Sequence, residues 1–477
     1  MNNFLARKPF APGGIREMLS IALPMVVSSA CDTVMTFTDR LFLARLGPEQ
    51  MNAAMAGGLT CFMLTTFFIG LTGYTTALAA QYLGAGRKDH CARAVTQSLL
   101  VCLAAYPVIL ACRPLGHAMF AVSGIVPEQL APQTMFFDIL LLGTCVSLAR
   151  NSLSAFFSGI GRTRIVMLSA MTAMAVNVGA NYILVFGKFG CPAMGIRGSA
   201  CGTILGGICG LLVVASGYFA KRNRIEYKIA GSFRFDRAVM GKLLRYGSPA
   251  GLEFFLNLLA FNVLILAFHS QGLAAATAVT IVFNWDMVSF VPLIGVNIGV
   301  TSLVGRYMGA GVPDTAHRAT MSGLKLAWMY ALCALFTFSC FPKPLVEVFH
   351  PGGDSGLFET AAPMAVFMLR LVSIYVLADA MNLVFSGALR GAGDTMWAMT
   401  ISVGLHWALV VIVVVLLRVA GLPVETAWSF LVFVILVFSG IFYLRYRCGK
   451  WRTIRMVQPA GEVFTPSTDG LHEPPDL

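Results

Sequence analysis

The chain has 477 residues, of which 57% are hydrophobic and only 12% are charged, and its mean hydropathy is +0.77. Soluble domains carry about 25% charged residues, so this composition excludes an ordinary soluble protein. The formal net charge of +12 would suit a nucleic-acid partner only if the basic residues formed one exposed surface, and their distribution indicates otherwise.

Twelve long apolar segments follow one another along the chain. About 20 apolar residues cross a bilayer as a helix, in which every backbone N–H and C=O group is paired internally. The sequence therefore predicts an all-α integral membrane protein with about 12 transmembrane helices. We expect these spans near residues 17–45, 52–83, 93–122, 131–159, 165–187, 195–219, 241–268, 277–308, 317–349, 360–389, 396–419 and 426–444.

Lys and Arg residues fall mainly on one side of these spans. That side holds the N-terminus, the loops around Arg87 and Arg162, the 221–245 connection and the segment after Arg445. By the positive-inside rule, we expect both termini in the cytoplasm and the protein in the cell (inner or plasma) membrane. The basic excess then reflects topology and contact with anionic membrane lipid, and we expect no nucleic-acid partner.

The first half of the chain is partly repeated in the second. Leu-Gly-Ala-Gly at 83–86 returns as Met-Gly-Ala-Gly at 308–311, and Pro24 returns as Pro249 with the same offset (249 − 24 = 225). Gly-Ile-Gly-Arg-Thr at 159–163 returns as Gly-Ala-Gly-Asp-Thr at 391–395. Such repeats in an apolar chain are typical of two-lobed membrane proteins whose working site lies between the lobes.

With six spans in each half and both termini on one side, the two lobes share one orientation. The tail is rich in Pro, Gly and acidic residues, a composition that favours disorder. Glycines at 202, 206 and 210 predict close packing of the sixth span against a neighbour. We expect a cytoplasmic N-terminus at 1–16, an N-lobe at 17–220, a cytoplasmic inter-lobe loop at 221–245, a C-lobe at 246–445, and a cytoplasmic basic segment with a disordered tail at 446–477.

Ionisable side chains inside membrane helices are costly and are therefore functional candidates. In the first span Asp32 and Asp39 share one helical face, and in the fifth span Asn177 and Asn181 share another. A carboxylate among hydroxyl and amide oxygens can bind sodium or hold a proton. The structural alternative is that Asp39 neutralises the arginines that follow it in the sequence.

The C-lobe also carries polar residues at membrane depth. Tyr375, Asp379 and Asn382 form one stripe along the tenth span, spaced at i, i+4 and i+7. The structural alternative for each of these residues is a helix–helix hydrogen bond or ion pair. The whole set is Glu253, Asn257, Asp286, Tyr375, Asp379 and Asn382.

No catalytic motif is recognisable in the sequence. The GxxxxGK[ST] phosphate loop and the HExxH and GxSxG motifs are absent. We therefore expect no enzyme and no direct use of ATP, so transport would depend on an ion gradient or on a partner's energy. We assign no role to Arg150 and Arg370, whose long side chains near span ends can reach the membrane surface.

Several blocks stand out by their order and spacing. They are Pro24 followed by Asp39 and Arg40, the repeated blocks at 81–86 and 305–311, the block at 177–190, and the block at 386–395. With them, the chain resembles the multidrug and toxic compound extrusion (MATE) family of cation-coupled exporters over about residues 15–445. The resemblance implies a V-shaped pair of six-helix lobes, which open alternately to either side and exchange inward sodium or protons for outward organic cations.

The resemblance also implies roles for individual residues. Asp39 is similar in position to the family's first-span carboxylate, and Asp379 to the carboxylate of the branch that contains bacterial norfloxacin exporters. Asn181 stands where another bacterial branch has an aspartate. In the norfloxacin-exporter branch the glutamate lies about one turn after Glu253, at the place of Asn257 here.

We therefore expect a cation-coupled antiporter that exports organic, cationic or amphipathic compounds by alternating access, with sodium or a proton as coupling ion and no cofactor. The cation-coupling residues are Asp39, Asp379 and Glu253, and a sodium ion would lie at Asp379 and Glu253. We expect a monomer whose partners are a small-molecule organic cation and membrane lipid. The expected substrate path is lined by Asn177, Asn181, Asn257, Asp286, Tyr375 and Asn382.

Two alternatives stay open. A flippase for lipid-linked precursors shares the two-lobe plan, but it would need cationic residues along its central cavity, and the intramembrane charges here are mainly acidic. A membrane receptor or scaffold without transport activity has no reason to place carboxylates at membrane depth in both halves.

Overall fold

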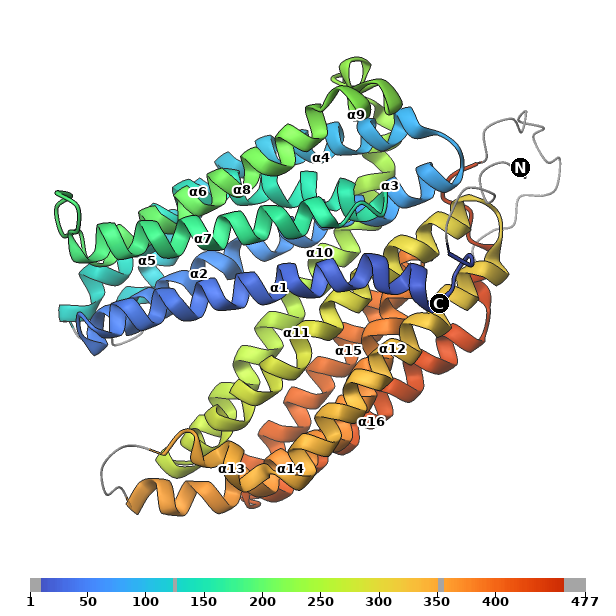
Figure 1. Cartoon of the computed structure of the whole chain (residues 1–477). Helices are drawn as coiled ribbons and strands as arrows, with labels where there is room; N and C mark the ends of the chain where they lie inside the picture. Colours follow the sequence, from blue (N-terminus) through green and yellow to red (C-terminus); the bar gives the residue numbers. More distant parts are fainter. Residues whose placement is uncertain (1–9, 123–126, 351–355, 459–477) are drawn as a thin grey trace.

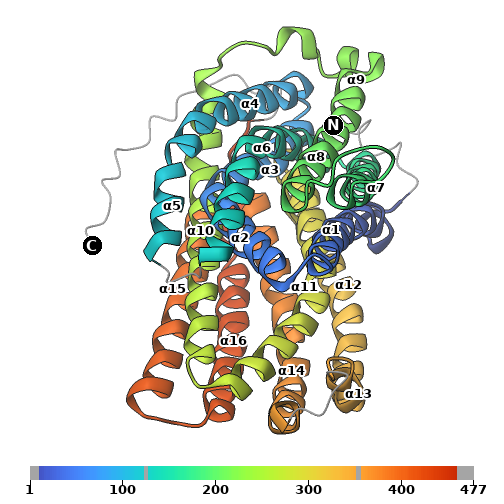
Figure 2. The same ribbon diagram turned by 90° about the vertical axis from the view of Figure 1, so that its left-hand side faces the viewer.

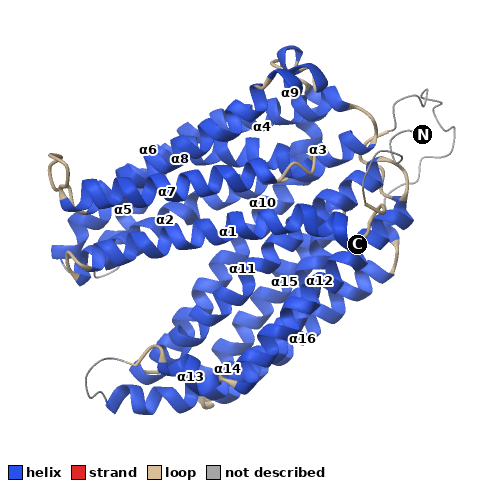
Figure 3. Cartoon of the chain, in the orientation of Figure 1, coloured by secondary structure: helices blue, strands red, loops and turns tan. Residues whose placement is uncertain are grey.

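The computed structural model describes residues 10–122, 127–350 and 356–458. All regular structure in this part of the chain is helical (Figure 3). Twelve helices or helix pairs within it are long and apolar enough to cross a membrane. The prediction of an all-α membrane protein with about 12 spans is therefore confirmed, with boundaries that shift by several residues.

The N-lobe contains the first six spans. Its second span is interrupted at Tyr74, which ends one helix and precedes the next. The helices are α1 (Ile15–Ala44), α2 (Pro48–Gly73), α3 (Thr75–Gly84), α4 (Lys88–Ala111), α5 (Arg113–Val122), α6 (Pro127–Gly159), α7 (Arg164–Phe186) and α8 (Ile196–Phe219).

A linker with two short helices, α9 (Lys221–Glu226) and η1 (Ile229–Gly231), leads to the C-lobe. The last span of the C-lobe is followed by a short helix, η3 (Lys450–Thr453). The helices of the C-lobe are α10 (Arg237–His269), α11 (Leu273–Gly309), α12 (Pro313–Cys340), α13 (Pro342–Glu347), α14 (Gly356–Ala392), α15 (Thr395–Val414) with its π-helical end η2 (Val415–Val419), and α16 (Val424–Arg447).

The two lobes form a V (Figure 1). They diverge at one end and meet at the other, where the end of α3 lies against α11. The view turned by 90° shows the lobes stacked, with α1 and α2 facing α10 and α11 across the boundary (Figure 2). The two-lobe prediction is confirmed, and α1, α2 and α3 of the N-lobe pack against α10 and α11 of the C-lobe.

Repeated glycines lie where the lobes meet. A Cβ atom on Gly84 would stand 1.9 Å from the carbonyl oxygen of Arg306, and a Cβ atom on Gly309 would stand 2.1 Å from that of Gln81. These are the equivalent glycines of the two repeats. The repeat therefore allows the backbones of α3 and α11 to touch, which a side chain at either position would prevent.

Buried polar contacts join the lobes beside these glycines. Glu17 of α1 lies 3.6 Å from Nη1 of Arg306, and both side chains are at most 5% exposed. The hydroxyl of Tyr307 donates to the carboxylate of Glu17 (2.6 Å). Gln81 Nε2 donates to the carbonyl oxygen of Gly391 (2.8 Å). A carboxylate of the N-lobe and a guanidinium of the C-lobe thus share one buried site at the closed end of the V.

The segment after η3 also packs at this junction. Met456 and Val457 are each 4% exposed, and the sulfur of Met456 accepts from the hydroxyl of Tyr74 (3.2 Å). The prediction of disorder after Arg455 is therefore wrong for these two residues, because their apolar side chains are buried between the lobes. Residues 459–477 of the same tail lie outside the described residues.

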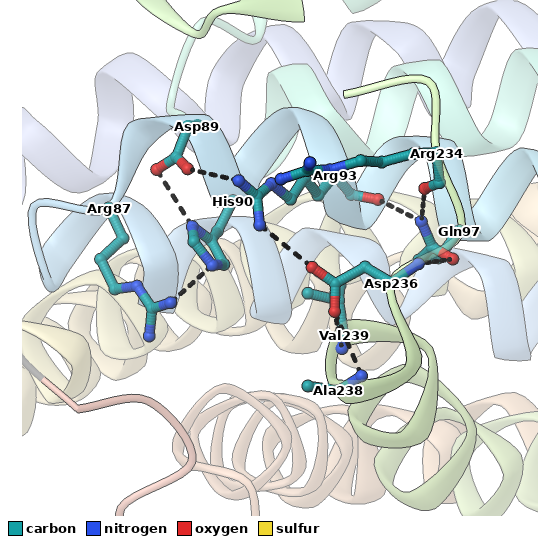
Figure 4. Close-up of polar contacts among 9 residues, drawn as sticks. All are labelled: Arg87, Asp89, His90, Arg93, Gln97, Arg234, Asp236, Ala238 and Val239. Atoms are coloured by element: carbon teal, nitrogen blue, oxygen red, sulfur yellow. Dashed lines mark hydrogen bonds and ion pairs between the residues drawn. The ribbon is translucent and has the colours of Figure 1, made fainter. Parts of the chain in front are cut away.

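Polar contacts fasten the linker to the N-lobe (Figure 4). Arg93 of α4 lies 3.1 Å from Asp236 and 3.2 Å from Asp89, and Gln97 donates to the carbonyl oxygen of Arg234 (2.9 Å). The carboxylate of Asp236 also accepts from two amides in the first turn of α10. Partial burial opposes ionisation, but these amides and Arg93 outweigh it and hold the pKa of Asp236 below its ordinary value.

Glu226 forms a second attachment. Its carboxylate lies 2.9 Å from Lys88 of α4 and 2.9 Å from Arg162, which precedes α7. Arg162 also donates to Asn223 of α9. Partial burial again acts against the charge, but Lys88 and Arg162 hold the pKa of Glu226 below its ordinary value. The Glu226 attachment lies within the N-lobe and its linker, whereas the Asp236 attachment also ties the first turn of α10 to α4.

Candidate ion and substrate sites

Three helices of the N-lobe bring Asp39 into a polar cluster. Its carboxylate accepts hydrogen bonds from Asn181 of α7 and from the hydroxyl of Thr203 of α8, the latter at 3.2 Å. Asn177, one turn before Asn181, donates to Thr203 (3.3 Å). Asp39 remains partly exposed, whereas both asparagines are fully buried. The structure thus brings together the three N-lobe residues that the sequence singles out.

Gly202 makes room for this cluster. A Cβ atom at that position would stand 1.9 Å from Oδ1 of Asn181, so the glycine-rich face of α8 permits the close packing on α7 that its spacing predicts. Oδ1 of Asn181 is buried and has no hydrogen-bond partner. Within the described residues, Asp39 forms hydrogen bonds rather than an ion pair with Arg40. The carboxylate and the Thr203 hydroxyl are oxygen groups of the kind that hard cations prefer. The amide nitrogen of Asn181 faces the carboxylate, so its Oδ1 would join them only if the amide turned over.

A second cluster lies between α11 and α14 of the C-lobe. The hydroxyl of Tyr375 donates to Asp286 (2.8 Å), and Asp286 interacts electrostatically with Asp379. Tyr375 is buried, but both carboxylates are partly exposed. Asn382, on the same face of α14 as Asp379, has a buried Oδ1 without a partner. In the structure Asp286 of α11 thus interacts with two residues of the α14 stripe, Tyr375 and Asp379.

Glu253 lies elsewhere. It is 2% exposed, and its carboxylate lies 2.7 Å from the guanidinium of Arg390 at the end of α14. Eleven residues of helix separate Arg390 from Asp379, which corresponds to about 16 Å along α14. Glu253 therefore pairs with Arg390 and not with Asp379. This arrangement corresponds to the structural alternative for Glu253, an ion pair between helices. A single sodium site at Glu253 and Asp379 is not assembled in this conformation.

Asn257 lies one turn after Glu253 on α10 and donates to the hydroxyl of Ser402 of α15 (2.7 Å). Its Oδ1 is buried and has no partner. Nowhere in the described ranges do three His, Cys, Asp or Glu side chains gather as they do at a transition-metal site. A bound cation would depend on mixed carboxylate, amide and hydroxyl oxygens.

Some partners escaped the sequence analysis. Arg150, expected only to reach the membrane surface, lies 3.1 Å from Asp32, so the two charges neutralise each other. Thr203 and Arg390, the partners of Asp39 and Glu253, were not predicted either. The one sequence feature that pointed to Thr203 is its position directly after Gly202, on a glycine-rich helix that packs closely on a neighbour. Arg390 carried no signal beyond its charge, because pairing with a residue 137 positions away is decided by tertiary packing.

The MatE family model matches this chain twice, over residues 24–183 and 249–416. The two matches begin at the two prolines that first indicated the repeat, and together they cover well over half of the chain. The family is therefore shown by the sequence itself, independently of the fold.

Curated relatives agree with this match. The chain is 26% identical to the multidrug resistance protein PmpM of Pseudomonas aeruginosa over 400 residues, which cover 83% of this chain and 82% of the relative. It is 24% identical to the probable multidrug resistance protein NorM of Thermotoga maritima, covering 91% and 93% of the two chains. It is 26% identical to the multidrug resistance protein MdtK of Yersinia enterocolitica, covering 83% and 85%.

Solved structures share the fold. A MOP superfamily transporter from Pyrococcus furiosus superposes with a TM-score of 0.84 at 19% identity, over 92% of this chain and 97% of the other. A multidrug resistance MATE family transporter in an outward-facing conformation gives 0.82 at 19% identity, over 94% and 98%. The chain belongs to the multidrug and toxic compound extrusion (MatE) family of membrane transporters.

Proposed function

We propose that the protein is a cation-coupled antiporter, which exports organic cationic or amphipathic compounds in exchange for sodium or protons. The carboxylate pair of Asp286 and Asp379 is the observation that carries this proposal. Two carboxylates that interact at membrane depth repel each other unless a cation or a proton lies with them. A coupling ion and a cationic substrate would therefore compete for the same pair.

Asp39 provides a second cation-binding group in the proposal. Its neighbours supply the hydroxyl oxygen of Thr203 and, if the amide of Asn181 turned over, an Oδ1 that has no partner. The two clusters lie in different lobes, so one ion or substrate can favour one relative position of the lobes over another. A ligand shifts such an equilibrium only by its difference in affinity between the two states.

We propose that the open end of the V faces the outside of the cell membrane. The basic loops and the junction of the lobes lie at the opposite end, which the positive-inside rule assigns to the cytoplasm. An external ion could then reach the partly exposed Asp39 and Asp379. Glu253 could bind a cation only after its ion pair with Arg390 separates, so we place its role in a later conformation of the cycle.

The flippase alternative gains no support from the charges inside the lobes. Arg150 is a cation in the N-lobe interior, but Asp32 neutralises it. A pyrophosphate group would need unpaired cations at that depth. A receptor without transport activity would not need two partly exposed carboxylates that act on each other.

The test is uptake of a fluorescent organic cation into proteoliposomes, driven in turn by a sodium gradient and by a proton gradient. Replacing Asp379 by Asn keeps the size of the side chain but removes the charge, so uptake should fall to the level of protein-free vesicles. Glu359→Gln is the matched control, because Glu359 is an exposed carboxylate on the same helix α14.

Normal uptake by Asp379→Asn at equal incorporation would refute the role of this carboxylate. Absence of uptake by the unmodified chain under both gradients, with several cations, would refute the antiporter itself. The gradient that drives uptake would identify the coupling ion.

A further inference from the structure

A cavity of about 530 Å³ lies in the N-lobe, away from both candidate ion sites. The end of α6, the turn into α7, the end of α8 and the start of α9 surround it, and Ser20 of α1 contributes to its wall. A Cβ atom on Gly161, which lines the cavity, would stand 2.3 Å from the guanidinium of Arg306. The cavity therefore lies at the closed end of the V.

The cavity is basic. Arg162, Arg164 and Arg222 line it, together with no acidic residue of the described chain. Glu226 lies beside it, 2.9 Å from Arg162 and 4.0 Å from Arg222. Three arginines against one glutamate leave two positive charges. Arg164 is exposed and makes no ion pair within the described residues, so it is available to a ligand.

A buried hydroxyl in the cavity has no partner. Thr163 is 1% exposed, and its Oγ1 makes no hydrogen bond. Buried polar groups almost always have a partner, and a hydroxyl can donate to an anionic oxygen. Thr163 also directly precedes α7, a helix of 23 residues whose N-terminal amides carry partial positive charge. Arginines, a residue with a buried hydroxyl and a helix end thus border one cavity.

The internal repeat provides a comparison within the same chain. Thr395 is the equivalent residue and is the first residue of α15, and its buried hydroxyl has no partner within the described residues either. However, Asp394 stands there in the place of Arg162, and Met396 in the place of Arg164. The same turn therefore occurs once with two arginines and once with an acidic and an apolar residue. Only the N-lobe copy has the charge to attract an anion.

We propose that this cavity binds a phosphate group, supplied either by the headgroup of an anionic phospholipid or by free phosphate. Arginine guanidinium groups form strong hydrogen bonds with phosphate oxygens, and the hydroxyl of Thr163 donates one more. Phe157 and Ile165 add apolar surface to the wall. The cavity lies at the ends of membrane-spanning helices, where lipid headgroups reside, and its charge suits either source.

Thermal unfolding of the purified full-length protein in detergent tests the proposal. Phosphatidylglycerol should raise the unfolding temperature more than phosphatidylcholine if the source is a lipid, and inorganic phosphate should raise it more than chloride at equal ionic strength if the source is free phosphate. Native mass spectrometry of the same samples would report the retained lipid directly.

Thr163→Val is the sharpest variant, because it removes only a hydroxyl that has no partner in the protein. The unfolding temperature without ligand should stay unchanged, whereas the affinity for the phosphate group should fall about tenfold. Thr395→Val is its matched control and should leave the affinity unchanged. R164Q/R222Q should abolish the ligand-induced shift, and R237Q/R318Q, which changes two exposed arginines outside the cavity, should not.

Each outcome decides the question. A shift with phosphatidylglycerol alone assigns the site to lipid, and a shift with inorganic phosphate alone assigns it to free phosphate. No shift with either probe overturns the proposal, as does an equal loss in R164Q/R222Q and R237Q/R318Q. If Thr163→Val lowers the unfolding temperature without ligand, the comparison of R164Q/R222Q with R237Q/R318Q decides the question, because these variants change only exposed side chains.

Discussion

Glu17→Gln should open the closed end of the V. The carboxylate of Glu17 in the N-lobe and the guanidinium of Arg306 in the C-lobe are both nearly inaccessible to water. Glutamine can still accept the hydrogen bonds from Tyr307 and from the amide of Gly13, so the substitution tests the negative charge. Arg306 would then remain buried at the junction without its counter-charge.

The magnitude follows from the position of the pair. Removing one partner of a buried ion pair costs about 3–5 kcal/mol, because the other charge stays buried and uncompensated. When the lobes separate at this end, Arg306 gains water, so the cost applies only to the closed state. About 3 kcal/mol corresponds to roughly a 100-fold shift in the equilibrium toward opening of this end.

Hydrogen exchange followed by mass spectrometry can measure this shift without labels, which matters in a chain with 12 cysteines. Peptides covering residues 75–86 and 302–312 should exchange faster in the variant, because they contain the helix ends that touch at the junction. Glu226→Gln is the control. It removes a carboxylate that pairs with Lys88 and Arg162 inside the N-lobe and its linker, so these peptides should not respond.

Unchanged exchange in both peptides of a folded Glu17→Gln protein would contradict this prediction. Equal acceleration of the same peptides in Glu226→Gln would contradict it as well. Either result would mean that the buried pair does not hold the lobes together.

Three further variants address other parts of the molecule. Gly309→Val places a side chain against the carbonyl oxygen of Gln81, so it should lower the unfolding temperature and slow transport, and normal values for both would contradict the contact. Thr203→Val removes a hydrogen bond that stabilises the charged form of Asp39, worth about 1.5–3 kcal/mol, so a proton should bind Asp39 more tightly. Uptake driven by a proton gradient should then reach half its maximum at about tenfold lower proton concentration, and an unchanged concentration would contradict the contact. The pKa of Asp236 is held below its ordinary value of 3.8, so its stabilising contribution is complete above that pH and is lost as pH falls below it. The unfolding temperature should therefore drop more on acidification in the unmodified chain than in Asp236→Asn, and parallel curves would contradict this.

Much of the fold could be predicted because the bilayer imposes strong constraints on sequence. Twelve apolar segments and a repeat that begins at Pro24 and Pro249 were sufficient for the span number and the two lobes. The break at Tyr74 was not predicted, because no proline or charge marks it. The burial of Met456 was not predicted for a different reason. Met456 and Val457 form a very short apolar stretch in a polar tail, and the surface that buries them exists only when both lobes are folded.

The candidate sites were predicted unevenly. Asp39 and Asn181 could each be selected because a polar residue in a membrane helix is costly, but the contact between them was not predicted. The ion pair of Glu253 and Arg390 could not be foreseen, since it depends on how α10 and α14 cross. Helical spacing identifies neighbours on one helix, whereas pairs between helices need the packing itself.

The glycine contact between α3 and α11 has a consequence for how the protein changes shape. Where two helices interlock through large side chains, separation requires many rotamers to change together. Here the contacts at Gly84 and Gly309 are made by backbone atoms, so the two helix ends can separate at these positions without any change of side-chain rotamer. Part of the resistance to opening then comes from the buried polar contacts, such as Glu17 with Arg306, whose strength depends on charge, and charge is what a coupling ion changes.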